Sequence, residues 1–356
     1  MSSGFQYKPM GFDASNVVLH YFNSVQNSSG GSAPTIGAGG RNSTSALIFT
    51  VPTGSTNPLS RAIKTLPVNL ATGFQPFAMI YNALPSSGEI IFLELRDAGT
   101  TQLDFRLQTD GRIRLTRAGT TLATSTFITA PNIYYHCEPG FTINDSTGAL
   151  DFKINENSIL AAPLTGIDTK NTANAYITEF ALCAVLVGAN ILTAVTIKFD
   201  DVGTRDDSYS GDFRVREQLP TGTGDVDNGV PGGSAAQPDT RRSVDETPPN
   251  DDVDWAGLVN VGDKFLLTFA AISTSEEVLC VGLAERATKS AAGTGKYKSV
   301  VKIGGTEYLG AVEKAPSNGS WAYLEEVQMF SPATGGSTPY TAAEVNGAQF
   351  GAEKTA

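Results

Sequence analysis

A histidine and a cysteine stand side by side at His136-Cys137, the two residue types from which a nucleophilic site could be built. Such a site needs the imidazole within hydrogen-bonding reach of the thiol. The run 134–143 around them is typical of a β-strand, and neighbours on a strand point to opposite faces of the sheet. The sequence therefore predicts that Cys137, like Cys183 in another apolar run, packs as a small buried hydrophobic residue.

Carboxylates could supply acid–base chemistry, and Glu89 and Glu94 flank and lie within the expected strand 90–96. Glycoside hydrolysis needs two carboxyl groups that project into one cleft. Glu94 alternates with apolar residues, which is typical of a solvated sheet face. A glycosidase is therefore kept only as an alternative, and no residue is assigned a catalytic role.

A third pattern could bind a cation, because carboxylates recur in the segment 250–254. Asp252 and Asp254 are weak calcium candidates. An EF-hand loop needs glycine at its sixth position and glutamate at its twelfth, where this chain has Trp255 and Val261. A turn held by aspartate side chains is the better interpretation. We expect no metal and no cofactor, and the sequence assigns no binding residues.

Composition narrows the classes of protein. The chain has 356 residues, 40% hydrophobic and 17% charged, which is enough for two domains and too apolar for intrinsic disorder. Three cysteines and two histidines are too few for a disulfide scaffold or a metal finger. A net charge of −11 repels phosphate backbones, so nucleic-acid binding is not expected. The sequence shows neither a signal-peptide pattern nor about 18 consecutive apolar residues, so we expect synthesis in the cytoplasm and no membrane insertion.

Short strands separated by turns fill the first 200 residues. The clearest hairpin has apolar residues alternating with Asp104 and Arg106, a turn at Thr109-Asp110-Gly111, and renewed alternation with Arg112 and Arg114. Further strands are expected at 47–51, 77–81, 90–96, 134–143, 150–154 and 176–182. This pattern predicts an all-β fold of the sandwich or jelly-roll class.

The composition changes after residue 199, which predicts a second domain. We place the jelly roll with its lead-in at 1–195, a smaller β-rich domain at 196–310, and a closing segment at 311–356. The smaller domain has a long polar loop at 221–249 and strand-like pieces at 213–216, 264–269, 278–283 and 299–303. The closing segment has a strand at 321–330 and a capping-box pattern, Thr341-Ala342-Ala343-Glu344, that opens a short helix.

Several motifs occur in an order found in one family. They are Gly40-Arg41, 46–49, 90–99, Asp110-Gly111-Arg112, 134–138, 145–155, 166–169, 211–215, Leu219-Pro220, 244–246, 250–255, 332–334 and 341–346. In this order they resemble structural proteins of tailed bacteriophages that contain a concanavalin A-like, laminin-G-type jelly roll. Tyr134 stands where the family has tryptophan, and Pro139 predicts an edge or a bulge in that strand. The residues with which laminin-G and lectin relatives bind calcium or sugar cannot be matched to positions in this sequence, so none is assigned from the resemblance.

The resemblance implies a function without catalysis. The protein is expected to be a structural component of a phage virion, in the tail, neck or fibre apparatus, acting in assembly and surface presentation. It would form a homo-oligomer, contact other virion proteins, and be released from the host cytoplasm by lysis. The alternatives are a carbohydrate-binding adhesin that contacts a host-surface glycan, a capsid decoration protein, and the glycosidase.

Overall fold

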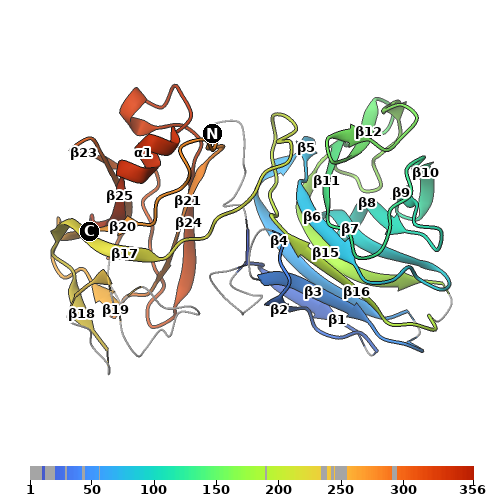
Figure 1. Ribbon diagram of the computed structural model, residues 1–356, viewed down its shortest axis with the longest axis horizontal. Helices are drawn as coiled ribbons and strands as arrows, with labels where there is room; N and C mark the ends of the chain where they lie inside the picture. Colours follow the sequence, from blue (N-terminus) through green and yellow to red (C-terminus); the bar gives the residue numbers. More distant parts are fainter. Residues whose placement is uncertain are drawn as a thin grey trace. The chain divides into compact units, whose positions relative to one another are not determined.

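The computed structural model describes residues 10–12, 21–28, 30–41, 45–55, 57–188, 191–233, 239–241, 244, 255–290 and 295–356. The chain divides into two compact units, the second of which begins at Glu217. Figure 1 shows strands throughout both units. None of the helices in these ranges is long and apolar enough to cross a bilayer.

The first unit is a sandwich of two antiparallel sheets. Among the described residues, the seven-stranded sheet has the order β1 (Ser24–Asn27), β4 (Leu59–Leu70), β15 (Ile177–Val187), β7 (Glu89–Asp97), β8 (Thr100–Leu107), β9 (Ile113–Arg117) and β10 (Thr120–Thr124). The nine-stranded sheet has the order β13 (Asn157–Ser158), β12 (Gly148–Ile154), β11 (Tyr135–Thr142), β6 (Phe77–Tyr81), β16 (Val195–Asp200), β3 (Ser45–Val51) and β2 (Thr35–Ala38), with β14 (Leu164–Ile167) paired to β12 and β5 (Thr72–Phe74) paired to β11. The predicted concanavalin A-like jelly roll is confirmed.

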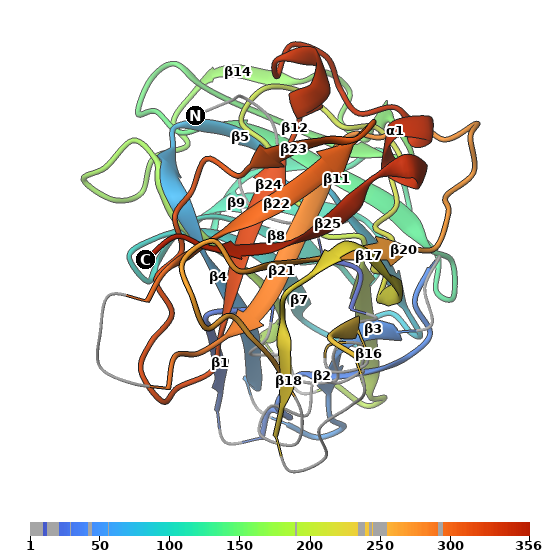
Figure 2. The same ribbon diagram turned by 90° about the vertical axis from the view of Figure 1, so that its left-hand side faces the viewer.

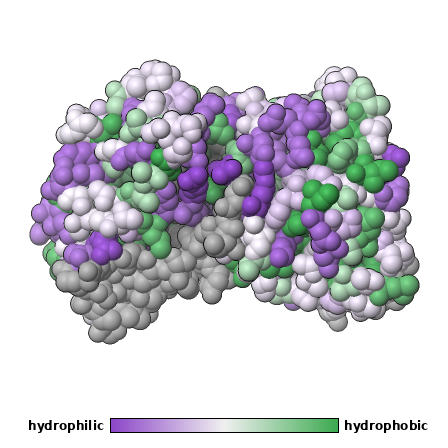
Figure 3. Space-filling view, viewed as in Figure 1, coloured by the Kyte–Doolittle hydropathy of each residue, from purple (hydrophilic) through white to green (hydrophobic). Residues whose placement is uncertain are grey.

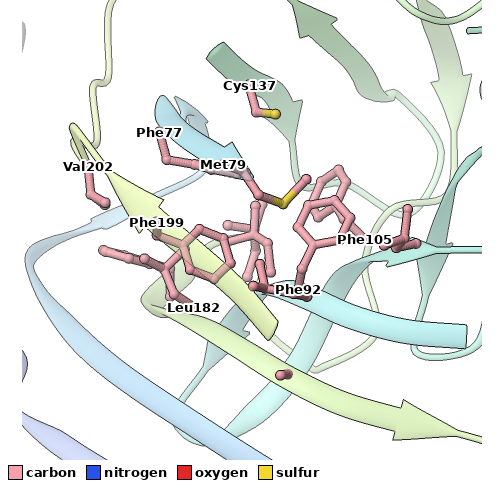
Figure 4. Packing of buried hydrophobic residues seen from close by; sticks show 14 of the residues in the cluster. Phe77, Met79, Phe92, Phe105, Cys137, Leu182, Phe199 and Val202 are labelled. Atoms are coloured by element: carbon pink, nitrogen blue, oxygen red, sulfur yellow. The ribbon is translucent and has the colours of Figure 1, made fainter. Parts of the chain in front are cut away.

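Aromatic side chains from both sheets fill the space between them. Phe92 and Phe105 extend from the seven-stranded sheet, and Phe77 and Phe199 extend from the nine-stranded sheet (Figure 4). The rings of Phe77 and Phe92 lie 6.3 Å apart, so the two layers touch directly. Cys137 points into this core and is fully buried, as predicted. Large buried aromatic surfaces of this kind supply most of the free energy that holds two sheets together.

The predicted hairpin is present as β8 and β9. Its turn uses Gly111 at φ 83°, and Asp110 Oδ1 accepts a hydrogen bond from the Arg112 amide at 3.0 Å. A Cβ atom at Gly111 would stand 2.5 Å from the Thr129 carbonyl oxygen. Glycine is therefore required here both for the backbone conformation and for the close approach of a neighbouring loop.

Pro139, expected at an edge or a bulge, lies inside the nine-stranded sheet, where one pairing partner of its strand gives way to another. Strand β11 pairs with β12 on one side along Cys137–Thr142. On the other side its partner is β6 up to Cys137 and β5 from Gly140 onward. Pro139 falls between these two partners, so its missing N–H costs no ladder hydrogen bond. Its carbonyl still accepts from the Gln75 amide at 3.0 Å.

Residues 201–216, which we call the strap, cover part of the outward face of the nine-stranded sheet. Glu138 of β11 accepts hydrogen bonds from the amide and hydroxyl of Ser210 at 2.6 and 2.8 Å. Farther along, the Phe213 ring meets the His136 ring edge-on at 5.9 Å. The prediction of a strand at 213–216 is thus wrong, because this segment pairs with no described strand. Side-chain contacts such as that of Phe213 with His136 attach it to the sheet.

The second unit has a five-stranded sheet in its described part, with the order β17 (Pro220–Asp227), β20 (Lys264–Phe269), β25 (Gln349–Lys354), β22 (Tyr297–Ile303) and β23 (Thr306–Leu309). Two ribbons accompany it, β18 (Val230–Gly232) with β19 (Trp255–Gly257) and β21 (Val281–Ala287) with β24 (Ala322–Gln328). Figure 2 shows β25 beside β22, and Phe350 of β25 packs on Val301 in a small core.

Three sequence predictions change in this half of the chain. The expected boundary at residue 195 is wrong, because β16 pairs with β3 and β6 in the sandwich. The closing segment is no separate part, because β25 lies between β20 and β22. The stretch 221–249 is a loop only in part, because β17 and β18 run through it. The predicted short helix is confirmed as α1 (Ala342–Gly347) with its capping box, after the 3₁₀ turn η3 (Pro332–Thr334).

Candidate functional site

Charged side chains gather on the outward face of the seven-stranded sheet, opposite the hydrophobic core. On β7, Glu94 and Arg96 alternate with Leu93 and Leu95, which belong to the core. The same alternation places Asp104 and Arg106 of β8 and Arg114 of β9 on this face. Arg61 of β4 and Glu179 of β15 reach it from the other side. We call these residues, together with Glu89, the charged face.

Glu94 stands at the centre of the first half of the charged face. Arg61 Nη2 donates to Glu94 Oε1 at 2.7 Å, and Arg61 Nε lies 2.6 Å from Oε2. Arg96 Nε lies 3.9 Å from the same Oε2, and Arg96 Nη1 lies 3.2 Å from Glu179 Oε1. Three strands, β4, β7 and β15, are thereby joined through side chains as well as through backbone hydrogen bonds.

The second half of the charged face is organised by Glu89. Arg106 and Arg114 are directly opposed on β8 and β9, an arrangement that would repel by itself. Glu89 lies between them, with Oε1 2.9 Å from Arg114 Nη2 and Oε2 3.6 Å from Arg106 Nη1. Arg106 also donates to Asp104. Asp104 and Arg106 thus pair along one strand of the hairpin, and the bridge between β8 and β9 comes from Glu89 of β7.

The charged face has a buried centre and a more accessible rim. Glu94 and Asp104 are each only 2% exposed although they lie outside the core, because neighbouring arginine stems cover them. Arg114 at the rim keeps 33% of its side chain exposed. Burial alone would lower the pKa of Arg61 and of Arg106, but the ion pairs with Glu94 and Asp104 outweigh it and raise both. Four guanidinium groups thus face four carboxylates in a rigid, charge-balanced array.

The structure revises the interpretation of Glu94 as a solvated residue. Glu94 and Asp104 are direct partners on β7 and β8, and Cβ atoms of such partners are about 5 Å apart. A retaining glycosidase needs two carboxyl groups about 5–5.5 Å apart, so this neighbouring pair has to be considered. Each of the two, however, already accepts a hydrogen bond from an arginine, Glu94 from Arg61 and Asp104 from Arg106. Their direct role is to hold these arginines in place.

The histidine–cysteine pair forms no nucleophilic site. Cys137 lies in the core, where burial raises the pKa of its thiol well above the usual range. His136 points to the opposite face, under the strap. Cys183 is also fully buried, on the same side of the sheet as the charged face, and burial raises the pKa of its thiol as well. The prediction that both thiols are buried is confirmed.

The calcium candidates Asp252 and Asp254 lie outside the described residues. Within the described ranges, no three histidine, cysteine, aspartate or glutamate side chains are grouped so that they could hold a metal ion. Sequence reasoning missed Arg61, Arg96 and Glu179 as members of the charged face. Its one usable signal was the alternation of charged with apolar residues along β7, β8 and β9.

Comparisons with known proteins give structural matches only. No family model matches the chain, and no curated protein matches it. Among solved structures, the chain is similar to alginate lyase vAL-1 from Chlorella virus, with a TM-score of 0.36, 10% identity, and coverage of 48% of this chain and 88% of the lyase. Cip1, a cellulose-induced protein, gives 0.38, 12%, 54% and 91% for the same quantities. A sialidase gives a TM-score of 0.37 at 11% identity, with coverage of 49% of this chain and 16% of the sialidase. The chain thus spans only a small part of the length of that protein.

These matches contradict the expectation of a non-catalytic virion component, since a lyase and a sialidase are carbohydrate-active enzymes. The expectation that the protein is no enzyme is contradicted with it. The similarity to phage proteins, the virion partners, the homo-oligomer and the release by lysis remain predictions.

Proposed function

We propose that this protein binds carbohydrate chains on the charged face of its sandwich. The observation that carries the proposal is the array itself, in which guanidinium and carboxylate groups alternate across five strands and are fixed by mutual ion pairs. Sugar hydroxyls both donate and accept hydrogen bonds. A surface that carries guanidinium and carboxylate groups in equal number, already held in place, offers both donors and acceptors without ordering its own side chains first.

Charge balance separates a glycan from other polar ligands. The four arginines of the charged face are neutralised by Glu89, Glu94, Asp104 and Glu179, so the face has no excess of positive charge for a phosphate backbone. The chain as a whole carries −11, which opposes nucleic acid further. On the side of the molecule in Figure 3, hydrophilic residues are interspersed with small hydrophobic areas among the coloured residues. Polar recognition of a hydroxyl-rich polymer fits these features.

Affinity electrophoresis tests the proposal. The protein is run through native gels that contain barley β-glucan, xylan, alginate or polygalacturonate, and retardation in at least one gel is expected. Arg114→Met removes an accessible rim arginine and should abolish most of the retardation. Lys296→Met, an exposed ion-paired lysine of the second unit, is the matched loss of one positive charge and should leave it unchanged. Release of reducing ends from a retained polysaccharide would extend the proposal from binding to cleavage. Equal mobility of the wild-type protein in all four gels and in a plain gel would contradict it.

A further inference from the structure

Trp255 occupies an unusual position on the small ribbon β18–β19 of the second unit. It opens β19 and is the direct cross-strand partner of Gly232 in β18. Gly257 follows two residues later on the same strand, and therefore on the same face. The side chain of Trp255 is 37% exposed, although tryptophan has the largest apolar surface of any residue.

The two glycines make room for the indole. A Cβ atom at Gly232 would stand within 2.6 Å of Trp255 Cζ3, and one at Gly257 would stand 2.7 Å from the same atom. Real Cβ atoms do not approach so closely, so the six-membered ring occupies the space that two side chains would fill. The ring is thereby held across the ribbon, and a ligand that contacts it does not have to restrict its rotamers.

The size and charge of the ribbon limit what can bind there. Each strand has three residues, so the ribbon is about 10 Å long, whereas a stable protein interface needs about 800 Å² from each partner. Its described residues, Val-Pro-Gly and Trp-Ala-Gly, carry no charge. The net charge of −11 opposes a nucleic-acid base as the stacking partner. The occupant that remains is a single uncharged ring with an apolar face, which the C–H face of a pyranose provides.

We propose that Trp255 is a second glycan contact, on which one pyranose ring of a carbohydrate chain stacks. The choice of a glycan rests on the proposed function of the charged face. The two sites lie on different units of the chain, so each can be removed without altering the other.

Fluorescence reports directly on this contact, because Trp255 and Trp321 are the two tryptophans of the chain. In a Trp321→Phe variant the emission comes from Trp255 alone. Cellohexaose, xylohexaose and hexagalacturonate serve as probes. A saturable change in Trp255 emission with at least one of them is expected. Absence of any change with all three would overturn the inference.

Two substitutions separate stacking from the mere presence of tryptophan. Trp255→Ala should weaken retention in the polysaccharide gels by about tenfold, the factor that corresponds to losing ~1.4 kcal/mol of apolar contact. Gly232→Ala keeps the indole but displaces it, and should weaken retention to a similar extent. Gly347→Ala is the matched control, since nothing lies within 4 Å of a Cβ atom there. Circular dichroism confirms that each variant is folded.

The outcomes distinguish this inference from the proposed function. Retention that is lost in Arg114→Met but unchanged in folded Trp255→Ala and Gly232→Ala would overturn the role of Trp255 and leave the charged face intact. Retention that is lost in Trp255→Ala but unchanged in Arg114→Met would overturn the proposed function and support the second contact.

Discussion

Acid should destabilise the sandwich through His136. The imidazole lies under the strap, 2% exposed, with the Phe213 ring edge-on against it. Its Nε2 atom is buried and has no hydrogen-bond partner among the described residues. Burial lowers the pKa of His136 to about 4, and Arg41 contributes in the same direction, while Asp212 and Glu156 oppose the shift. Folding therefore favours the neutral imidazole.

The magnitude follows from the difference between the ordinary pKa of 6.5 and the value of about 4 in the folded protein. A shift of ~2.5 units at 1.36 kcal/mol each amounts to about 3 kcal/mol. Because the pKa is depressed on folding, this stability is fully present above pH 6.5. It is lost progressively as the pH falls from 6.5 through about 4, where the imidazole in the folded protein also becomes protonated.

Proton NMR and urea unfolding measure the two halves of this prediction. The chain has two histidines, so the imidazole signal that disappears in a His136→Gln variant belongs to His136. That signal should titrate near pH 4. Urea unfolding of the sandwich is followed by far-ultraviolet circular dichroism, because both tryptophans lie in the second unit and report on that unit alone. Between pH 7 and pH 4, wild type should lose about 3 kcal/mol more than the variant.

Carboxylates elsewhere in the chain titrate alike in wild type and in the His136→Gln variant. The difference in stability between the two proteins therefore reports on His136 alone. A His136 signal that titrates near pH 6.5 would refute the reasoning. So would a stability difference between wild type and variant that stays constant across this pH range.

Three further substitutions test ion pairs and a helix cap. Glu94→Gln leaves Arg61 without its carboxylate in a buried setting, and should lower the free energy of unfolding of the sandwich by about 3 kcal/mol in urea titrations; a loss below ~1 kcal/mol would mean that the charged face contributes little order. Lys314→Met removes the buried cation that pairs with Glu285 in the second unit. It should lower the free energy of unfolding of that unit by about 3 kcal/mol, seen as a lower urea midpoint of the tryptophan-detected transition, and an unchanged midpoint would contradict this. Thr341→Ala removes the hydroxyl that accepts from the Glu344 amide, although the Thr341 amide still donates to the Glu344 carboxylate, and should cost about 1 kcal/mol in the same transition, whereas Thr341→Ser should cost little.

Much of the sandwich could be predicted because its strands are short runs of β-branched, aromatic and other apolar residues, continuous in some strands and alternating with charges in others. The run 77–81 is β6, and 90–96 falls inside β7. The longest strand, β4, was missed because its buried positions do not alternate regularly and Pro67 interrupts it. Strand β17 was missed for a different reason. It has almost no large apolar residue, and its pairing with β20 is a backbone property that composition does not reveal.

The charged face marks the limit of such reasoning more sharply. Alternation correctly places Glu94 on the outward face of β7, but it does not say whether an outward residue meets water. Glu94 is buried because Arg61, 33 residues earlier, and neighbouring arginines close over it. The alternation shows only that opposite charges stand at successive outward positions, Glu94 and Arg96 on β7 and Asp104 and Arg106 on β8, where they can pair. On this sheet the opposite charges of adjacent strands pair with one another, and the result is a buried array in place of a wet surface.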